Sequence, residues 1–113
     1  MSNTNTEKNG IDAVIAYEKA RGRTGLRVNR CGYDIESYGN GEERHIEVKS
    51  TGKSSFTRRW LEELEYQTLQ KDDKFWVYLV TNANSQPYVS VLNATEVKAR
   101  FKGEIKHYCF DFS

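Results

Sequence analysis

The chain has 113 residues, of which 37% are hydrophobic and 29% are charged, and its formal net charge at pH 7 is +1. This length allows one compact domain and excludes a second, independent recognition domain, while the near-neutral charge means that any affinity for nucleic acid must come from locally clustered charge. No apolar run approaches the roughly 18 residues that cross a bilayer, and the polar N-terminus lacks a signal-peptide core, so we expect a cytoplasmic protein with no membrane partner.

The first half of the chain predicts a helix followed by three strands. Residues 1–8 are polar and are expected to form a disordered tail. Apolar side chains at Ile11, Val14 and Ile15 then recur at helical spacing, and Gly22 is a plausible stop. Alternating segments predict strands over residues 26–31, 33–38 and 44–50.

The second half predicts two helices and three strands. The expected elements are a helix over 57–71, strands over 75–81 and 87–92, a helix over 93–101 and an edge strand over 107–112. The apolar anchors of the first of these helices are Trp60, Leu61, Leu64 and Leu69. Asn93 followed by Glu96 is a capping-box pattern for the last helix. The whole order predicts one α/β domain over residues 9–113, with a mixed β-sheet flanked by helices.

The turn between the second and third strands places two carboxylates together. Residues 40–41 are Asn-Gly, the strongest short signal for a two-residue hairpin turn. In that hairpin, cross-strand partners have residue numbers that sum to 81, so Asp34 lies opposite Glu47. In the same register Glu36 lies opposite His45. Opposed residues share a sheet face, with Cβ atoms roughly 4.5–5.5 Å apart.

Alternation along the two strands sorts their side chains into an ionisable face and an apolar face. The ionisable face carries Asp34, Glu36, His45, Glu47 and Lys49, and the other carries Tyr33, Ile35, Ile46 and Val48. An opposed Asp–Glu pair is destabilising by itself, but it suits a hard cation, since Mg²⁺ prefers carboxylate and water oxygens. The alternative is a solvated face on which Lys49 neutralises Glu47.

These residues resemble a known nuclease signature. Gly32-Tyr33-Asp34 followed by Ile46-Glu47-Val48-Lys49 resembles the Asp…Glu-x-Lys motif of the PD-(D/E)XK (restriction-endonuclease-like) superfamily. More narrowly, the chain is similar to the DUF3883 family, the C-terminal domain of the plant protein NO VEIN. That family's pattern also has a helix with Tyr-Glu, here Tyr17-Glu18, a later helix with a glutamate, here Glu62, and an aromatic strand, here 75–80. The resemblance spans about residues 10–82.

The resemblance implies a fold, a cofactor and a reaction. The fold is a central mixed sheet flanked by helices, and the cofactor is Mg²⁺ (or Mn²⁺). Asp34 and Glu47 would bind the metal together with the backbone carbonyl of Val48, while Lys49 would stabilise charge or position a water. The reaction is attack by metal-activated water on a phosphodiester, with DNA as the expected substrate and RNA as the alternative.

Four further residues have a weaker claim to the site. Glu18 falls on the apolar face of the first helix, where an unpaired carboxylate is costly. It therefore either reaches the site as a catalytic residue or pairs with an arginine such as Arg21. Glu62, Gln67 and His45 are possible auxiliary residues. Their alternatives are a helix-terminus charge, a solvent-facing amide and a paired surface histidine.

Basic residues next to aromatic ones suggest where nucleic acid would bind. The candidates are Arg21, Arg23, Arg58, Arg59 and Lys53, with Arg27 and Arg30 extending the first basic run. Phe56 and Trp60 lie beside the second group. The glutamates that follow at 62, 63 and 65 offset this charge, so helix solubility is an equal explanation.

The sequence does not predict a zinc site. Cys31 and Cys109 are far apart and belong to no Cys-x-x-Cys motif, and His45 and His107 are isolated. Zinc ligands usually occur in closely spaced pairs, so the cysteines are expected to be free thiols in a reducing compartment.

The expected function is therefore a metal-dependent DNA endonuclease. One centre of this kind cuts one strand, so cutting both strands would need a homodimer or a larger protein partner. The alternative is a non-catalytic nucleic-acid-binding or protein-interaction module on the same fold, because fold alone does not decide activity.

Overall fold

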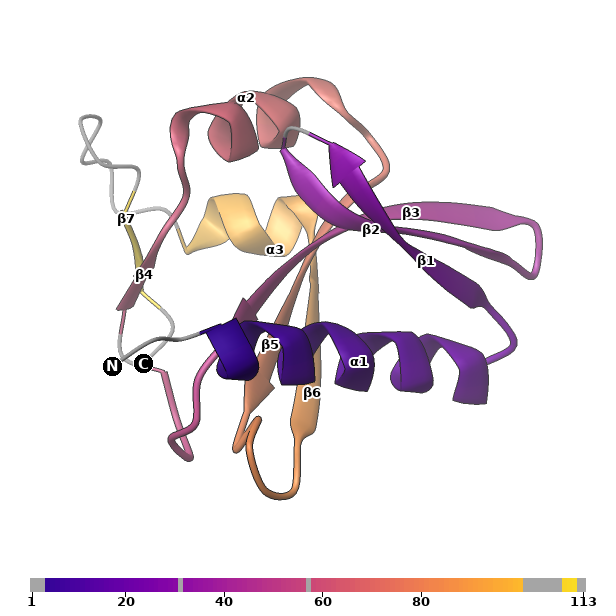
Figure 1. Cartoon of the computed structure of the whole chain (residues 1–113). Helices are drawn as coiled ribbons and strands as arrows, with labels where there is room; N and C mark the ends of the chain where they lie inside the picture. The colour runs from indigo at the N-terminus through magenta and orange to yellow at the C-terminus, as the bar shows by residue number, and fades with distance from the viewer. Residues whose placement is uncertain (1–3, 31, 57, 101–108, 112–113) are drawn as a thin grey trace.

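A mixed five-stranded sheet forms the centre of the molecule (Figure 1). The computed structural model describes residues 4–30, 32–56, 58–100 and 109–111. In chain order the elements are α1 (Thr4–Ala20), β1 (Thr24–Arg30), β2 (Tyr33–Gly39), β3 (Glu42–Ser50), β4 (Arg58–Trp60), α2 (Glu63–Lys71), β5 (Phe75–Thr81), β6 (Tyr88–Asn93), α3 (Ala94–Ala99) and β7 (Cys109–Asp111). The central order is β1-β2-β3-β5-β6, while β4 and β7 form a separate pair. Only β3 and β5 run parallel; the other pairs are antiparallel.

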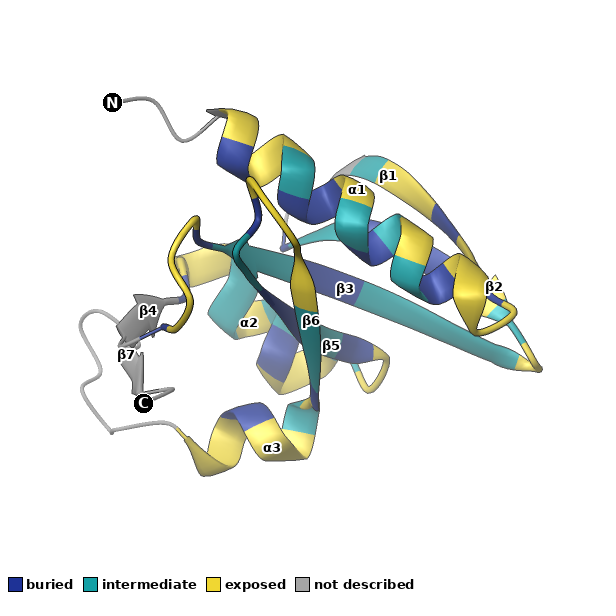
Figure 2. Ribbon diagram, turned by 90° about the horizontal axis from the view of Figure 1, so that it is seen from below, coloured by how far each residue is buried: buried dark blue, intermediate teal, exposed yellow. Residues whose placement is uncertain are grey.

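Helices cover both faces of the central sheet. Figure 2 shows α1 on one side and α2 and α3 on the other. The core on the α1 side consists of Ile11, Val14, Ile35, Ile46, Tyr78, Val80 and Ala83. The opposite core consists of Phe56, Leu61, Leu69, Phe75, Val77, Leu79, Leu92 and Val97. Strand β5 supplies alternate residues to both cores, which explains why its sequence is continuously apolar. The expected architecture of a mixed sheet flanked by helices is confirmed.

The β2–β3 hairpin has the predicted register. Ile35 pairs with Ile46 and Glu36 pairs with His45, so partner numbers sum to 81. The turn residue Asn40 has φ 55° and Gly41 has φ 73°. Positive φ at both central positions is what a two-residue type I′ turn requires, and Asn-Gly is the sequence that adopts it at low cost.

Helix α1 begins earlier than expected. It starts at Thr4, so residues 4–8 are helical and the predicted tail over residues 1–8 is wrong for that part. Tertiary contacts explain the difference: Thr6 is buried, and its hydroxyl accepts a hydrogen bond of 3.1 Å from the amide of Asn84. The predicted stop at Gly22 is confirmed, since this residue has φ 82° just beyond the helix.

The second helix is shorter than expected. Residues 58–60 form strand β4, which pairs with β7, and helix α2 begins at Glu63. Glu65 accepts a hydrogen bond from the backbone N–H of Glu62 at 3.0 Å, which ends the extended segment and starts the helix. Of the expected anchors, Leu61 and Leu69 are buried, Leu64 is 50% exposed, and Trp60 lies in β4 rather than in the helix. The side chain of Trp60 lies outside the described residues.

Smaller differences concern β1, Tyr33 and α3. Strand β1 carries an irregularity between Arg27 and Arg30. Tyr33, which follows it at the start of β2, stacks on His45 with ring centroids 4.5 Å apart. Its expected place on the Ile35 face is therefore wrong. Helix α3 has the predicted capping box but ends at Ala99 rather than Phe101.

Some expectations fall on parts of the chain that the structure leaves out. Cys31, His107 and the side chain of Cys109 lie outside the described residues. Within the described part of the chain, no helix is long and apolar enough to span a membrane.

Candidate active site

Strands β2 and β3 separate at one end of their hairpin (Figure 1). Their pairing ends at Ile35 and Ile46, although β3 continues beside β5 as far as Ser50. We call the gap between Asp34 and residues 47–50 the fork. The fork interrupts the sheet, so groups from both faces can reach the same space.

The fork exposes the backbone of Val48. The N–H groups of His45 and Thr51 donate to carbonyls at the two ends of β5, Lys74 and Val80. Because backbone groups alternate in direction along a strand, the N–H and C=O of Val48 point the other way, into the fork. The Val48 N–H donates to the Asp34 carboxylate at 2.9 Å, which leaves its carbonyl without a ladder partner from β2.

A cavity of about 650 Å³ lies at the fork. Asp34, Glu47 and Lys49 all line it, so the three residues that the hairpin register grouped together are adjacent in space. The full lining is Thr6, Glu7, Ile11, Arg27, Asp34, Glu47, Val48, Lys49, Ser50, Thr51, Gly52, Glu62 and Glu65. Helix α1 therefore contributes one wall, and the start of α2 contributes the opposite wall.

Lys49 is held by two carboxylates. Its ammonium donates to Glu65 at 2.9 Å and lies 3.4 Å from Glu47. Burial alone would lower the pKa of Lys49, but these two carboxylates raise it above its usual value. Lys49 is therefore a fixed positive charge in the cavity.

Glu47 is buried and Asp34 is partly buried, and too little positive charge surrounds the two carboxyl groups. Burial is the largest cause that raises the pKa of Glu47, to about 10; Lys49 opposes this shift, while Asp34 and Glu65 add to it. Burial also raises the pKa of Asp34, against the Val48 N–H. Both shifts favour the protonated form of the carboxyl group.

The cavity as a whole is acidic. Its lining holds five carboxylates, on Glu7, Asp34, Glu47, Glu62 and Glu65, and only two cations, Arg27 and Lys49. With every carboxylate ionised the formal charge of the lining is −3. A bound divalent cation would reduce this excess to −1 and would favour the ionised forms of Asp34 and Glu47.

The donor set fits Mg²⁺ or Mn²⁺. Among the described residues, no group of three or more His, Cys, Asp or Glu side chains is arranged to hold a metal. The oxygen donors that face the fork include the Asp34 and Glu47 carboxylates and the Val48 carbonyl. Mg²⁺ is commonly bound by one or two carboxylates, with water and substrate phosphate completing its shell.

Glu18 does not reach this cavity. It is fully buried on the α1 side, where Arg23 donates to it at 2.6 and 2.8 Å. Ser37 and Tyr78 donate further hydrogen bonds at 2.7 and 2.8 Å. The expected catalytic role of Glu18 is thus corrected to a buried ion pair, and its partner is Arg23 instead of Arg21.

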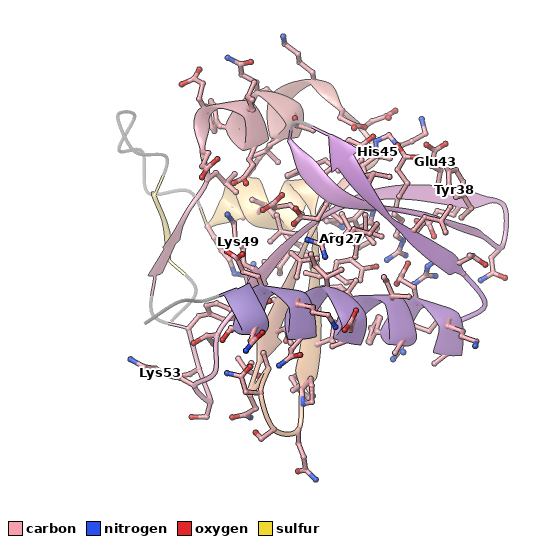
Figure 3. The ribbon with its side chains drawn as sticks, in the orientation of Figure 1. Arg27, Tyr38, Glu43, His45, Lys49 and Lys53 are labelled. Atoms are coloured by element: carbon pink, nitrogen blue, oxygen red, sulfur yellow. The ribbon has the colours of Figure 1, made fainter. Side chains whose placement is uncertain are left out.

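Of the expected nucleic-acid-binding residues, the three whose side chains the structure describes, Arg21, Arg23 and Lys53, do not line the cavity. Arg23 is buried against Glu18 and is unavailable for a ligand. Arg21 is exposed, with its guanidinium 3.6 Å from the ring centre of Tyr17. Lys53 is exposed and points away from the fork (Figure 3). The side chains of Arg58 and Arg59 lie outside the described residues.

The auxiliary candidates divide in the same way. Glu62 lines the cavity. Gln67 lies outside it and donates to Glu63 at 2.8 Å. The His45 ring lies between Asp72 and Glu43, with hydrogen bonds of 2.5 and 2.6 Å. Burial would lower the pKa of His45, but these two carboxylates raise it.

Three charged residues of the cavity, Glu7, Arg27 and Glu65, were not among the expected catalytic, metal-binding or auxiliary residues. Glu65 holds Lys49, and Arg27 reaches the cavity from β1. The only sequence signal for Glu65 is its spacing of three residues from Glu62, which is the capping-box spacing. Arg27 is one arginine of a basic run, and nothing in the sequence separates it from its neighbours.

Comparisons with known proteins identify the family and the fold. The family model described as protein NO VEIN, C-terminal, matches residues 6–94. The solved structure of Hjc, a Holliday junction resolvase from Archaeoglobus fulgidus, matches with a TM-score of 0.64. That match has 14% sequence identity and covers 93% of this chain and 88% of the resolvase chain. No curated protein sequence matches significantly. The fold is therefore the restriction-endonuclease-like fold of nucleases.

Proposed function

This chain belongs to the NO VEIN C-terminal family, and on that premise we propose that it is a metal-dependent endonuclease that hydrolyses phosphodiester bonds in DNA. The observation that supports this proposal most strongly is the fork, where Asp34, Glu47 and Lys49 line one cavity. DNA is the first substrate to test because the structural neighbour is described as a Holliday junction resolvase.

The proposed cofactor is Mg²⁺ or Mn²⁺, held by Asp34, Glu47 and the carbonyl of Val48. A divalent cation at such a site supplies a Lewis acid that lowers the pKa of bound water and neutralises charge on the phosphate. Glu47 is 5% exposed and Asp34 is partly buried, so both ligands are held within the folded sheet and lose little mobility on binding.

Lys49 is proposed to act on the substrate side of the site. Glu65 and Glu47 fix its ammonium in the cavity, where it remains protonated at neutral pH because both carboxylates raise its pKa. A fixed ammonium stabilises the negative charge that develops on phosphate oxygens during hydrolysis. Glu65 is then a positioning residue for Lys49.

The proposal is tested by plasmid nicking in Mg²⁺ or Mn²⁺, with the unfolding temperature of each variant measured across the same metal titration. Wild type should nick the plasmid and be stabilised by the metal, and Glu47→Ala should lose both effects. Glu63→Gln is the matched control, since it removes an exposed carboxylate of α2 that pairs with Gln67.

Each other outcome decides against part of the proposal. Nicking that survives Glu47→Ala shows that the cleavage comes from another site or another protein. Stabilisation by the metal without nicking would support a metal-binding module and would overturn the proposed nuclease activity. If wild type shows neither effect, the non-catalytic module on the same fold becomes the better hypothesis.

A homodimer or a larger protein partner is proposed only for double-strand cleavage. One fork provides one set of Asp34, Glu47 and Lys49, which serves one strand at a time. Conversion of a supercoiled plasmid to the nicked form without linear product is therefore the expected result for a monomer.

A further inference from the structure

Arg27 has an unusual position among the cations near the fork. It lines the cavity, and Figure 3 shows its side chain and that of Lys49 in the space between α1 and α2. Strand β1 pairs Arg27 with Ile35, whose side chain lies in the α1-side core. Arg27 thus enters from the α1 side of the sheet, while Lys49 enters from the side of α2.

The guanidinium of Arg27 is uncommitted. It makes no hydrogen bond and no ion pair with any residue that the structure describes, and its side chain is exposed. Five carboxylates line the same cavity, yet none is paired with it. The ammonium of Lys49, in contrast, already contacts Glu65 and Glu47.

An uncommitted guanidinium in this place suits a phosphate. Its planar group of N–H donors matches two phosphate oxygens at once, and such charge-assisted pairs are stronger than neutral hydrogen bonds. Because Arg27 and Lys49 approach from opposite sides of the sheet, each can bind a different phosphate. Successive phosphates of one nucleic-acid strand offer separate contacts to the two sides of the fork.

We propose that Arg27 binds a phosphate next to the scissile one, so that the cavity takes an oligonucleotide strand laid across the fork rather than an isolated phosphodiester. This inference rests on the proposed function for the identity of the scissile phosphate. It adds the substrate class: a strand with at least one phosphate beside the bond that is cut.

Binding is measured with a fluorescent 12-nucleotide DNA strand in Ca²⁺, which supports binding without fast turnover, for wild type and three variants. Arg27→Ala should raise Kd by about 10- to 100-fold, the usual effect of losing a hydrogen bond to a charged group. The Kd of Arg27→Lys should lie between those of wild type and Arg27→Ala, because lysine keeps the charge and loses the paired N–H donors. Arg100→Ala, which removes an exposed arginine just after α3 and outside the cavity, should match wild type.

The salt dependence of Kd gives a readout that a structural role would not change. Loss of one phosphate contact should reduce the slope of log K against log salt by about 0.7 for a single strand. Cleavage adds a second readout: Arg27→Ala should lose at least tenfold more rate on the oligonucleotide than on bis(p-nitrophenyl) phosphate, which has no neighbouring phosphate.

The outcomes separate this inference from the proposed function. Equal Kd and slope for Arg27→Ala and Arg100→Ala overturn the role of Arg27, even if wild type cleaves DNA. Equal loss of rate on both substrates overturns the neighbouring-phosphate assignment. If wild type binds DNA through Arg27 but never cleaves it, the proposed nuclease activity is overturned, while the role of Arg27 as a phosphate-binding residue is supported. If wild type does not bind DNA, both the activity and the role of Arg27 are overturned.

Discussion

Glu18 on α1 and Glu47 on β3 are both buried carboxylates, but their surroundings differ. Glu18 accepts hydrogen bonds from Arg23, Ser37 and Tyr78. Burial alone would raise its pKa, and these donors, Arg23 above all, hold the pKa below its usual value. Around Glu47 burial dominates, and Lys49 alone does not compensate for two neighbouring carboxylates, so its pKa is raised.

This difference separates a structural ion pair from a site. The charge of Glu18, on the α1 side, is balanced by Arg23 within the protein, so this carboxylate needs no ligand. The charges of the fork carboxylates are not balanced within the protein, because the folded chain brings several carboxylates together without an equal number of cations. A buried group whose charge the protein does not balance is a good candidate for binding something that does.

The largest predicted effect concerns Glu18. Replacing Glu18 with Ala leaves the guanidinium of Arg23 buried without its partner, which should lower the free energy of unfolding by about 3–5 kcal/mol. Urea denaturation measures it. Asp12→Ala is the control: that carboxylate is 58% exposed and pairs with Lys8 on the surface, so the expected loss is about 0–1 kcal/mol. Equal losses in the two variants would contradict the distinction drawn above.

Should Glu18→Ala fail to fold, Glu18→Gln still decides the question. The glutamine keeps the size of the side chain and removes only its charge, so a smaller loss of stability is expected.

The second effect has the opposite sign. Without metal at pH 7, Glu47→Gln should raise the free energy of unfolding, by about 1–3 kcal/mol, because the Glu47 carboxyl must take up a proton on folding and the glutamine does not. With Mn²⁺ at 100 times Kd, wild type should gain about 2.7 kcal/mol and the variant nothing. Urea denaturation in EDTA and then in Mn²⁺ measures both. Destabilisation of Glu47→Gln in EDTA, similar to that of Glu18→Gln, would show that the two carboxylates do not differ.

The smallest effect is a pH dependence. The folded pKa of Glu18 lies below its usual value of 4.5, so its contribution to stability is fully present above this pH and is lost as pH falls through the folded pKa. The slope from one carboxylate is at most about 1.4 kcal/mol per pH unit. Urea denaturation between pH 3 and 6 should therefore show wild type and Glu18→Gln converging at low pH. A stability difference that does not change with pH would argue against the charged pair.

The parts of the molecule that were predictable from sequence depend on local rules. The Asn40-Gly41 turn has positive φ at both residues, and this preference determines the hairpin register without reference to the rest of the chain. Side-chain alternation then brings Asp34, Glu47 and Lys49 to one place. The capping box at Asn93 is also local, and it started a helix where it was expected.

The errors share one physical origin. Strand β4 needs its partner β7, which lies about 50 residues further along the chain, so its sequence was read as the start of a helix. For Glu18 the sequence leaves both the site and an arginine partner open, because part of its network is distant: Arg23 is nearby, but Tyr78 is 60 residues away.

The sequence by itself determined the α/β class, the hairpin and the grouping of two carboxylates with a lysine, because turn preference and the twofold period of a strand act over a few residues. Only the tertiary structure decided which carboxylates are balanced. It closed Glu18 into a network with Arg23 and opened the fork where β2 leaves β3, and it brought Glu65 to Lys49 and Arg27 to the cavity. Charge balance in a folded protein depends on contacts between distant segments, and no local pattern encodes them.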